Sequence, residues 1–112
     1  MSMRLIVSMV FLMPLVAQQA PTNLKILTPA EIGPVMQSFT AGLGVRCEFC
    51  HVQGDRASDA NPHKVVAREM LAMTRQINTH FPGGAKVACY TCHRGAEQPL
   101  MAPPAGAAPP GR

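Results

Sequence analysis

The 112-residue chain contains no tryptophan, one tyrosine and four phenylalanines, so aromatic residues make up only 4% of it. We therefore do not expect an ordinary aromatic-rich core. Charged residues are also scarce, at 14% against roughly 25% in average domains. The length excludes a multidomain enzyme and a multi-span membrane protein. The net charge is only +4 and no run of Lys and Arg occurs, which excludes a nucleic-acid-binding protein.

The first 17 residues have the composition of a secretory signal peptide. Arg4 precedes a mostly apolar run, Leu5–Val16, and small and polar residues follow from Ala17. This run is shorter than the about 20 residues needed to span a bilayer. We predict a signal peptide over residues 1–17, which would direct the rest of the chain to the periplasm or the outer face of the cytoplasmic membrane. The alternative is an uncleaved N-terminal anchor.

All four cysteines lie in two copies of the pattern C-x-x-C-H, which is the attachment sequence of c-type haem. The copies are Cys47-Glu48-Phe49-Cys50-His51 and Cys89-Tyr90-Thr91-Cys92-His93. The two thiols of one copy can each bond a vinyl group of the same porphyrin, and the adjacent histidine can ligate the iron. The sequence therefore predicts two covalently bound c-type haems, with the four cysteines as attachment points and His51 and His93 as iron ligands.

Three other readings of the cysteines explain the pattern less well. A zinc ribbon has 15–20 residues between its two pairs, whereas 38 residues separate Cys50 from Cys89. Two disulfides suit an exported chain but leave the repeated histidine unexplained. A thioredoxin-like redox pair requires a βαβ setting, and the sequence does not predict one.

A helix is predicted to begin at Thr28-Pro29-Ala30-Glu31, with Thr28 as the N-cap, and to run to about Ala41. Its apolar face contains Met36 and Phe39. Gly42 is expected to end the helix, and Gly42-Leu43-Gly44 to let the chain reverse into the first motif. The reversal brings Met36 towards the first haem, as the iron ligand opposite His51. The alternative is a core methionine that fills a gap.

A second helix is predicted from Pro62 to about Thr79, after a loop over residues 52–61. The break at Phe81-Pro82-Gly83-Gly84 then leads to the second motif. Spacing alone does not choose between Met70 and Met73, which lie on one stripe of this helix, as the ligand of the second iron. His63 and His80 are the only histidines outside the motifs, and a lone histidine is more often a surface residue than a ligand.

The predicted fold is therefore mostly α: a small dihaem c-type cytochrome in which a helix–turn–CxxCH unit occurs twice and the core is built around two haems. We expect one domain over residues 18–98. A Pro-, Ala- and Gly-rich tail over residues 99–112, with five of the eleven prolines, is expected to be disordered.

Three stretches resemble the cytochrome c subunit of photosynthetic reaction centres. They are Met36–Val52, Val65–Thr79 and Val87–Gly95. The resemblance covers about residues 23–99 and includes positions between the motifs as well as the motifs themselves. That family binds four haems in two tandem halves, and this chain resembles a dihaem relative of about one half.

The resemblance implies the iron ligands, since most irons of the family have one His and one Met. It implies His51 with Met36 on the first iron. On the second iron it implies His93 with Met70. Met73 is the second choice for this ligand, and it would be a packing residue if Met70 ligates the iron.

The expected function is that of an extracytoplasmic one-electron carrier and not an enzyme. Its partners would be redox proteins, such as a membrane-bound reaction centre or a respiratory complex, with no nucleic acid and no small-molecule substrate. One alternative is a small dihaem enzyme with one open iron site, similar to a peroxidase. Another is a haem module of a larger multihaem assembly.

Overall fold

The structure, a computed structural model, describes residues 19–84, 86–108 and 111. The predicted signal peptide over residues 1–17 lies outside the described residues. The described part is mostly helical and contains no β-sheet, and its single strand-like pairing is an isolated bridge between Val52 and Asp55. The mostly α prediction is confirmed at this level.

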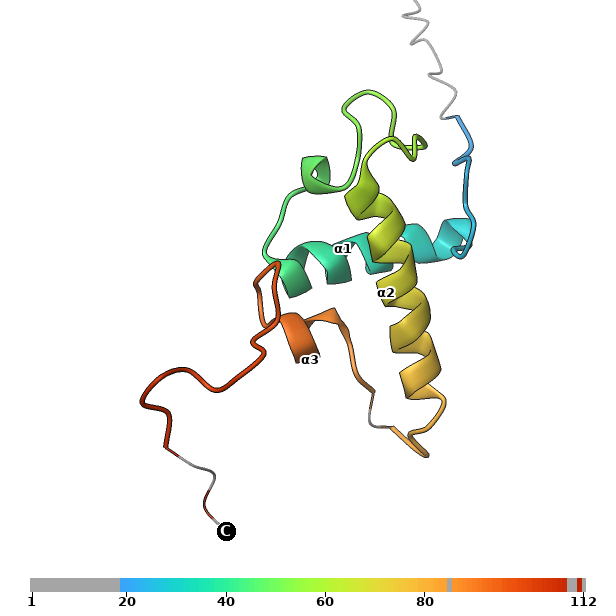
Figure 1. Ribbon diagram of the computed structural model, residues 1–112. Helices are drawn as coiled ribbons and strands as arrows, with labels where there is room; N and C mark the ends of the chain where they lie inside the picture. The colour runs from blue at the N-terminus through green and yellow to red at the C-terminus, as the bar shows by residue number, and fades with distance from the viewer. Residues whose placement is uncertain (1–18, 85, 109–110, 112) are drawn as a thin grey trace, which may run out of the picture.

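The helices are short and are joined by long irregular segments (Figure 1). In chain order they are the 3₁₀ turn η1 (Pro29–Glu31), α1 (Ile32–Leu43), the 3₁₀ turn η2 (Cys47–Phe49), α2 (Pro62–Asn78) and α3 (Cys89–His93). The first C-x-x-C-H motif begins with η2, and the second forms α3. None of the helices in the described residues is long and apolar enough to cross a bilayer.

The start of the first helix follows the sequence prediction. The backbone N–H and the hydroxyl of Thr28 both donate to the Glu31 carboxylate, at 2.8 and 2.9 Å. The backbone hydrogen bond from Thr28, followed by the one from its side chain, lowers the pKa of Glu31. This is the reciprocal side-chain contact of a capping box.

The predicted end of the first helix was wrong by one half-turn. Gly42 lies inside α1, and the helix continues to Leu43. Gly44, with a φ of 67°, is the residue that ends it, because the left-handed conformation is accessible to glycine without strain. The predicted second helix, from Pro62 to about Thr79, agrees with α2 to within one residue.

Gly42 is buried because α3 crosses α1 at this point. A Cβ atom on Gly42 would lie 2.6 Å from the Cβ of Cys89, and one on Gly44 would meet the carbonyl oxygen of Gly95. The N–H of Gly95 donates to the Gly42 carbonyl at 2.8 Å. The two C-x-x-C-H motifs are therefore held together through the C-terminal end of α1.

Near its C-terminal end, α2 is held to other segments of the described chain by polar contacts of Arg75 and Asn78. Arg75 forms an ion pair with Glu31 at 2.8 Å and donates to the Ile26 carbonyl at 2.7 Å. Three residues after Arg75, the Asn78 side chain donates to the Val87 carbonyl at 2.9 Å and accepts from the Val87 N–H at 2.8 Å. The Asn78–Val87 clamp fixes the segment that leads into α3.

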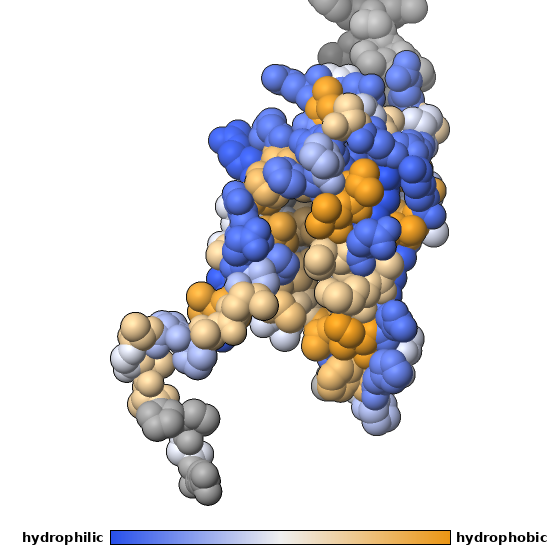
Figure 2. Space-filling model, viewed as in Figure 1, coloured by the Kyte–Doolittle hydropathy of each residue, from blue (hydrophilic) through white to orange (hydrophobic). Residues whose placement is uncertain are grey.

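None of the apolar side chains in the described residues is fully buried. Exposed apolar residues instead lie along α2, including Val66, Met70, Met73 and Ile77, which are 36–51% exposed. Figure 2 shows apolar residues beside the hollow between α2 and the rest of the molecule. This agrees with the expectation, from the scarcity of aromatics, that the chain lacks an ordinary core.

The glycine crossing predicts a sharp difference between two Gly→Ala variants of α1. Gly42→Ala should lower the midpoint of thermal unfolding, because its methyl group would overlap Cys89. Gly33→Ala is the matched control, because no atom lies within 4 Å of a Cβ there, and it should be neutral or stabilising by up to about 1 kcal/mol. Equal midpoints for the two variants would show that the close crossing is not required.

Candidate haem sites

Each motif histidine is held by a hydrogen bond to a backbone carbonyl. His51 Nδ1 lies 3.0 Å from the Arg56 oxygen, and His93 Nδ1 lies 3.0 Å from the Ala96 oxygen. A carbonyl can only accept, so the proton resides on Nδ1 of both rings. This tautomer leaves the lone pair on Nε2, which is the arrangement that a metal-ligating histidine needs.

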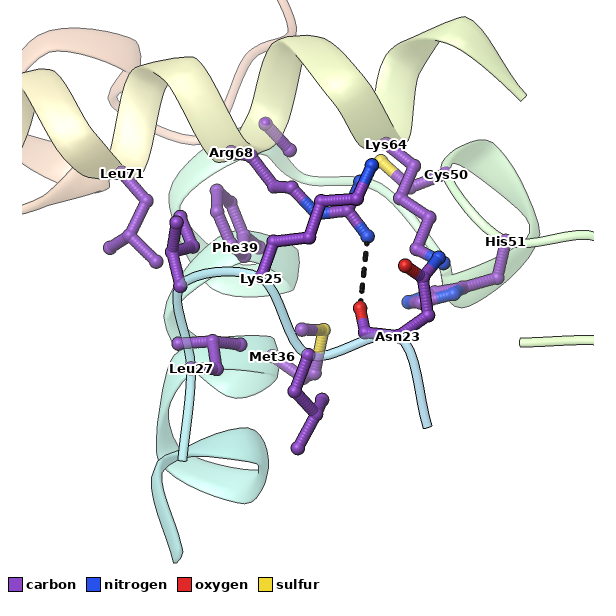
Figure 3. Close-up of a pocket in the computed structure, with 13 residues that line it drawn as sticks. Asn23, Lys25, Leu27, Met36, Phe39, Cys50, His51, Lys64, Arg68 and Leu71 are labelled. Carbon is purple, nitrogen blue, oxygen red and sulfur yellow. Dashed lines mark hydrogen bonds between the residues drawn. The ribbon is translucent and has the colours of Figure 1, made fainter. Parts of the chain in front are cut away.

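The first cavity, of about 70 Å³, lies where α1, α2 and the segment of residues 23–27 meet. Met36 and Phe39 of α1 line it together with Cys50 and His51 of the first motif. Figure 3 shows Met36 and His51 among the labelled residues around this cavity. The structure therefore brings Met36 close to the first motif, as the chain reversal predicted, and a thioether, a thiol and an imidazole border one space.

The second cavity is larger, about 380 Å³, and lies between α2 and α3. Both Met70 and Met73 line it, as do Cys89, Cys92 and His93. The structure therefore places the donors expected for the second iron around one cavity. Because both methionines line the same cavity, the cavity does not show which of them is the ligand.

The two cavities share part of their walls. Phe39, Cys50 and Ala67 line both of them. In addition, the Ser38 hydroxyl of α1 lies 3.6 Å from Cys89 Sγ. One face of α1 thus serves both motifs, and the two sites adjoin each other.

The residues present fit a c-type haem at each motif. A thiol pair, the Nε2 lone pair of the adjacent histidine and a nearby thioether are the donor set of a Met/His c-type site. At the second motif both thiols line the cavity, whereas at the first motif Cys50 lines it and Cys47 does not. The second cavity adds apolar side chains that would cover a porphyrin. The first cavity is much smaller, so the fit there rests on its donors and not on its volume.

The alternative uses of the cysteines find no support in the geometry. None of the four thiols is paired in a disulfide. Within the described ranges, no three His, Cys, Asp or Glu side chains gather in a way that could hold a metal ion. Burial raises the pKa of the Cys50 thiol.

His63 has a supporting position that the sequence did not reveal. Its Nδ1 donates to the Phe49 carbonyl at 3.0 Å, and its ring stacks on the Phe49 ring with centroids 4.2 Å apart. The Asn61 side chain donates to the same carbonyl at 3.0 Å. The start of α2 therefore holds the first motif in place. His63 also lines the second cavity, whereas His80 lines neither.

Asp59 joins the segment before α1 to the start of α2. Lys25, Arg68 and Lys64 form ion pairs with its carboxylate at 2.9, 2.9 and 3.3 Å, and Asn23 donates to it at 2.9 Å. The hydrogen bonds from Lys25 and Asn23, with smaller ones from Arg68 and Lys64, lower the pKa of Asp59 well below its ordinary value. This Asp59 cluster holds residues 23–27 at the first cavity.

Comparison with known proteins shows which family the chain belongs to. The model of the family described as "Photosynthetic reaction centre cytochrome C subunit" matches residues 16–102. The chain belongs to this family. The resemblance stated from the motifs is thereby confirmed.

Several known proteins are similar to this chain. Cytochrome c-554 of Chloroflexus aurantiacus is 37% identical over 95 aligned residues, which cover 74% of this chain and 23% of that protein. The photosynthetic reaction center cytochrome c subunit of Rubrivivax gelatinosus is 36% identical over 91 residues, covering 74% and 25%. The subunit of Thermochromatium tepidum is 37% identical over 84 residues, covering 70% and 21%.

The chain spans about a quarter of the length of these relatives. This share is smaller than the one half that the sequence analysis expected.

The Asp59 cluster makes a pH-dependent prediction. The folded pKa is lowered from the ordinary value of 3.8. The stabilisation is therefore complete above that value and is lost as the pH falls through the lowered folded pKa. We expect limited proteolysis near residues 23–27 to accelerate in acid, and Asp59→Asn to give the same acceleration already at neutral pH.

Glu69→Gln provides the control, because it removes an exposed carboxylate of α2 for which the described residues show no ion pair. It should leave the cleavage rate unchanged. An Asp59→Asn chain as resistant as the wild type at neutral pH would show that the cluster does not hold this segment.

Proposed function

We propose that this chain is an extracytoplasmic dihaem cytochrome c that carries single electrons between redox proteins. The observation that carries the proposal is that the histidines of the two motifs have the same surroundings. In each, the histidine has its Nδ1 bonded to a carbonyl and its Nε2 lone pair available, beside a cavity that also holds cysteine and methionine sulfur atoms. Membership in the family supports the same function.

The chain's own residues would hold and shield the group. Bound haem supplies an iron that changes between its ferric and ferrous states. The carbonyl bonds at Arg56 and Ala96 fix the planes of the two imidazole rings. Methionine thioethers raise the reduction potential relative to a second histidine, and the apolar lining limits the access of water.

The two sites are placed for electron exchange with each other. Phe39, Cys50 and Ala67 belong to both cavity walls, and the crossing at Gly42 packs α1 against α3. A carrier with adjoining centres can accept an electron at one and release it at the other. We therefore infer a unit with two coupled centres rather than two independent ones.

Met36 and His51 would be the protein ligands of the first iron. For the second iron, the family resemblance favours Met70 together with His93. The Asn78–Val87 clamp holds the chain entering α3 beside the C-terminal end of α2, and Met73 is one helical turn nearer to that end. The two arguments point to different methionines, so the experiment below tests each one.

We further propose that residues 1–17 are a signal peptide, that residues 18–98 form the haem domain and that residues 99–112 are a disordered tail. The partners would be a donor and an acceptor protein, such as a membrane-bound reaction centre or a respiratory complex. No small-molecule substrate and no enzymatic step is part of this proposal.

Haem stoichiometry tests the proposal directly. The chain, exported from a host that matures c-type cytochromes, should have an intact mass that includes two covalent haems. The double variant Cys47→Ser/Cys50→Ser should retain one haem, and so should Cys89→Ser/Cys92→Ser as its matched counterpart. A wild-type chain with no covalent haem would overturn the proposed function.

The distal ligands are tested by single Met→Leu variants, which nearly conserve side-chain volume. The weak long-wavelength Met–iron absorption band should lose intensity in Met36→Leu and in one of Met70→Leu and Met73→Leu, and cyanide should bind those variants faster. Met101→Leu is the control, because Met101 is 92% exposed. An unchanged band in Met36→Leu would refute that ligand, and rapid cyanide binding by the wild type would favour an open-site enzyme.

A further inference from the structure

The Arg56 carbonyl oxygen accepts two hydrogen bonds. One comes from His51 Nδ1 at 3.0 Å, and the other comes from Lys64 Nζ at 2.9 Å. The proposed iron ligand and an ammonium group thus share one acceptor atom. A carbonyl oxygen has two lone pairs and can serve both donors.

The Lys64 ammonium group is held in this position by further hydrogen bonds. Its ammonium group also donates to the carbonyls of Ala57 and Ser58 at 2.7 and 2.8 Å, so its three N–H donors have three successive backbone acceptors. Its side chain is only 12% exposed. The Lys64 side chain therefore fixes the loop that holds His51 and is not a solvated surface charge.

A positive donor on the Arg56 oxygen changes what His51 experiences. The ammonium group draws electron density from the oxygen, which then accepts more weakly from His51 Nδ1–H. A weaker Nδ1–H bond leaves the imidazole less basic at Nε2, because outer partners set the basicity of a metal-binding histidine. A less basic ligand stabilises ferric iron less, and hydrogen bonding around a haem ligand is one of the levers on reduction potential.

The second motif lacks this arrangement. The Ala96 carbonyl accepts from His93 Nδ1, and within the described residues no charged side chain donates to that oxygen. The two histidines therefore have the same kind of acceptor but a different charge next to it.

We propose that Lys64 is a positioning residue that raises the reduction potential of the first haem, through the Arg56 carbonyl shared with His51. The inference rests on the proposed function, since it requires a haem at His51. Its consequence is an inequality between the two centres that the duplicated motif does not predict.

The surrounding charges supply a control. Lys25, Lys64 and Arg68 all pair with Asp59, so each contributes one positive charge to the same cluster. Lys25 Nζ is hydrogen-bonded to Asp59 and not to the Arg56 oxygen. Removing Lys25 therefore changes the local charge by the same amount while leaving the shared carbonyl intact.

The test is a redox titration of the dihaem protein, with wild type compared with Lys64→Met, Lys64→Gln, Lys64→Arg and Lys25→Met. The His51 Nδ1 proton, followed by NMR in the reduced protein, gives a second readout. We expect Lys64→Met and Lys64→Gln to lower the potential of the first haem, to leave the second unchanged and to shift the Nδ1 proton. Lys64→Arg should keep most of the wild-type potential. Lys25→Met should lower the potential of the first haem by much less than Lys64→Met does and should leave the Nδ1 proton unshifted, because it leaves the shared carbonyl intact.

Two results would overturn the proposal. An equal drop in Lys64→Met and Lys25→Met would show a through-space charge effect instead of one through the carbonyl. An unchanged first-haem potential in both Lys64→Met and Lys64→Gln would show no effect at all. The mass of each variant is checked first, because loss of haem from the wild type contradicts the proposed function, whereas retained haems with unshifted potentials contradict only the role of Lys64.

Discussion

The close approach of α1 to α3 is the contact on which the rest of the molecule depends. It requires glycine at position 42, where any side chain would overlap Cys89, and at position 44, where the chain is left-handed and touches Gly95. The Gly95 N–H to Gly42 carbonyl bond fixes the crossing at one register. With no fully buried apolar side chain in the described residues, this contact and a few polar clamps order the protein around its two cavities.

The sequence predicted the donors well because they are carried by local patterns. The two C-x-x-C-H motifs name six of the proposed haem-binding residues directly. The N-cap residue Thr28 and the proline at the first helical position, Pro62, place the starts of both longer helices. The period of apolar residues on α1 places Met36 on the face that reaches the first cavity. Each of these inferences uses residues within a few positions of one another.

What the sequence did not predict depends on contacts between distant residues. The sequence predicts that Gly42 ends a helix because glycine commonly has that role. In the structure, glycine is needed there because Cys89, 47 positions later in the chain, packs against it. The same limit applies to His63, whose partner Phe49 precedes it by 14 residues, and to the Asp59 cluster. Which of Met70 and Met73 lies nearer to the second motif likewise depends on how distant residues hold α2, and spacing within the helix does not encode it.

The two motifs are alike in sequence but are supported in different ways. His93 is held by a three-residue return in which Arg94 and Gly95 both have positive φ, so the local backbone alone brings the Ala96 carbonyl to the ring. His51 is held by a longer loop. Lys64 of α2 binds that loop, and Asn61 and His63 bind the Phe49 carbonyl of the motif itself. A change in the position of the start of α2 therefore acts on the carbonyl partner of His51, whereas the carbonyl partner of His93 is set by the local backbone. Duplication of the motif supplies two equal sets of donors, and the unequal neighbours are what can make the two centres differ.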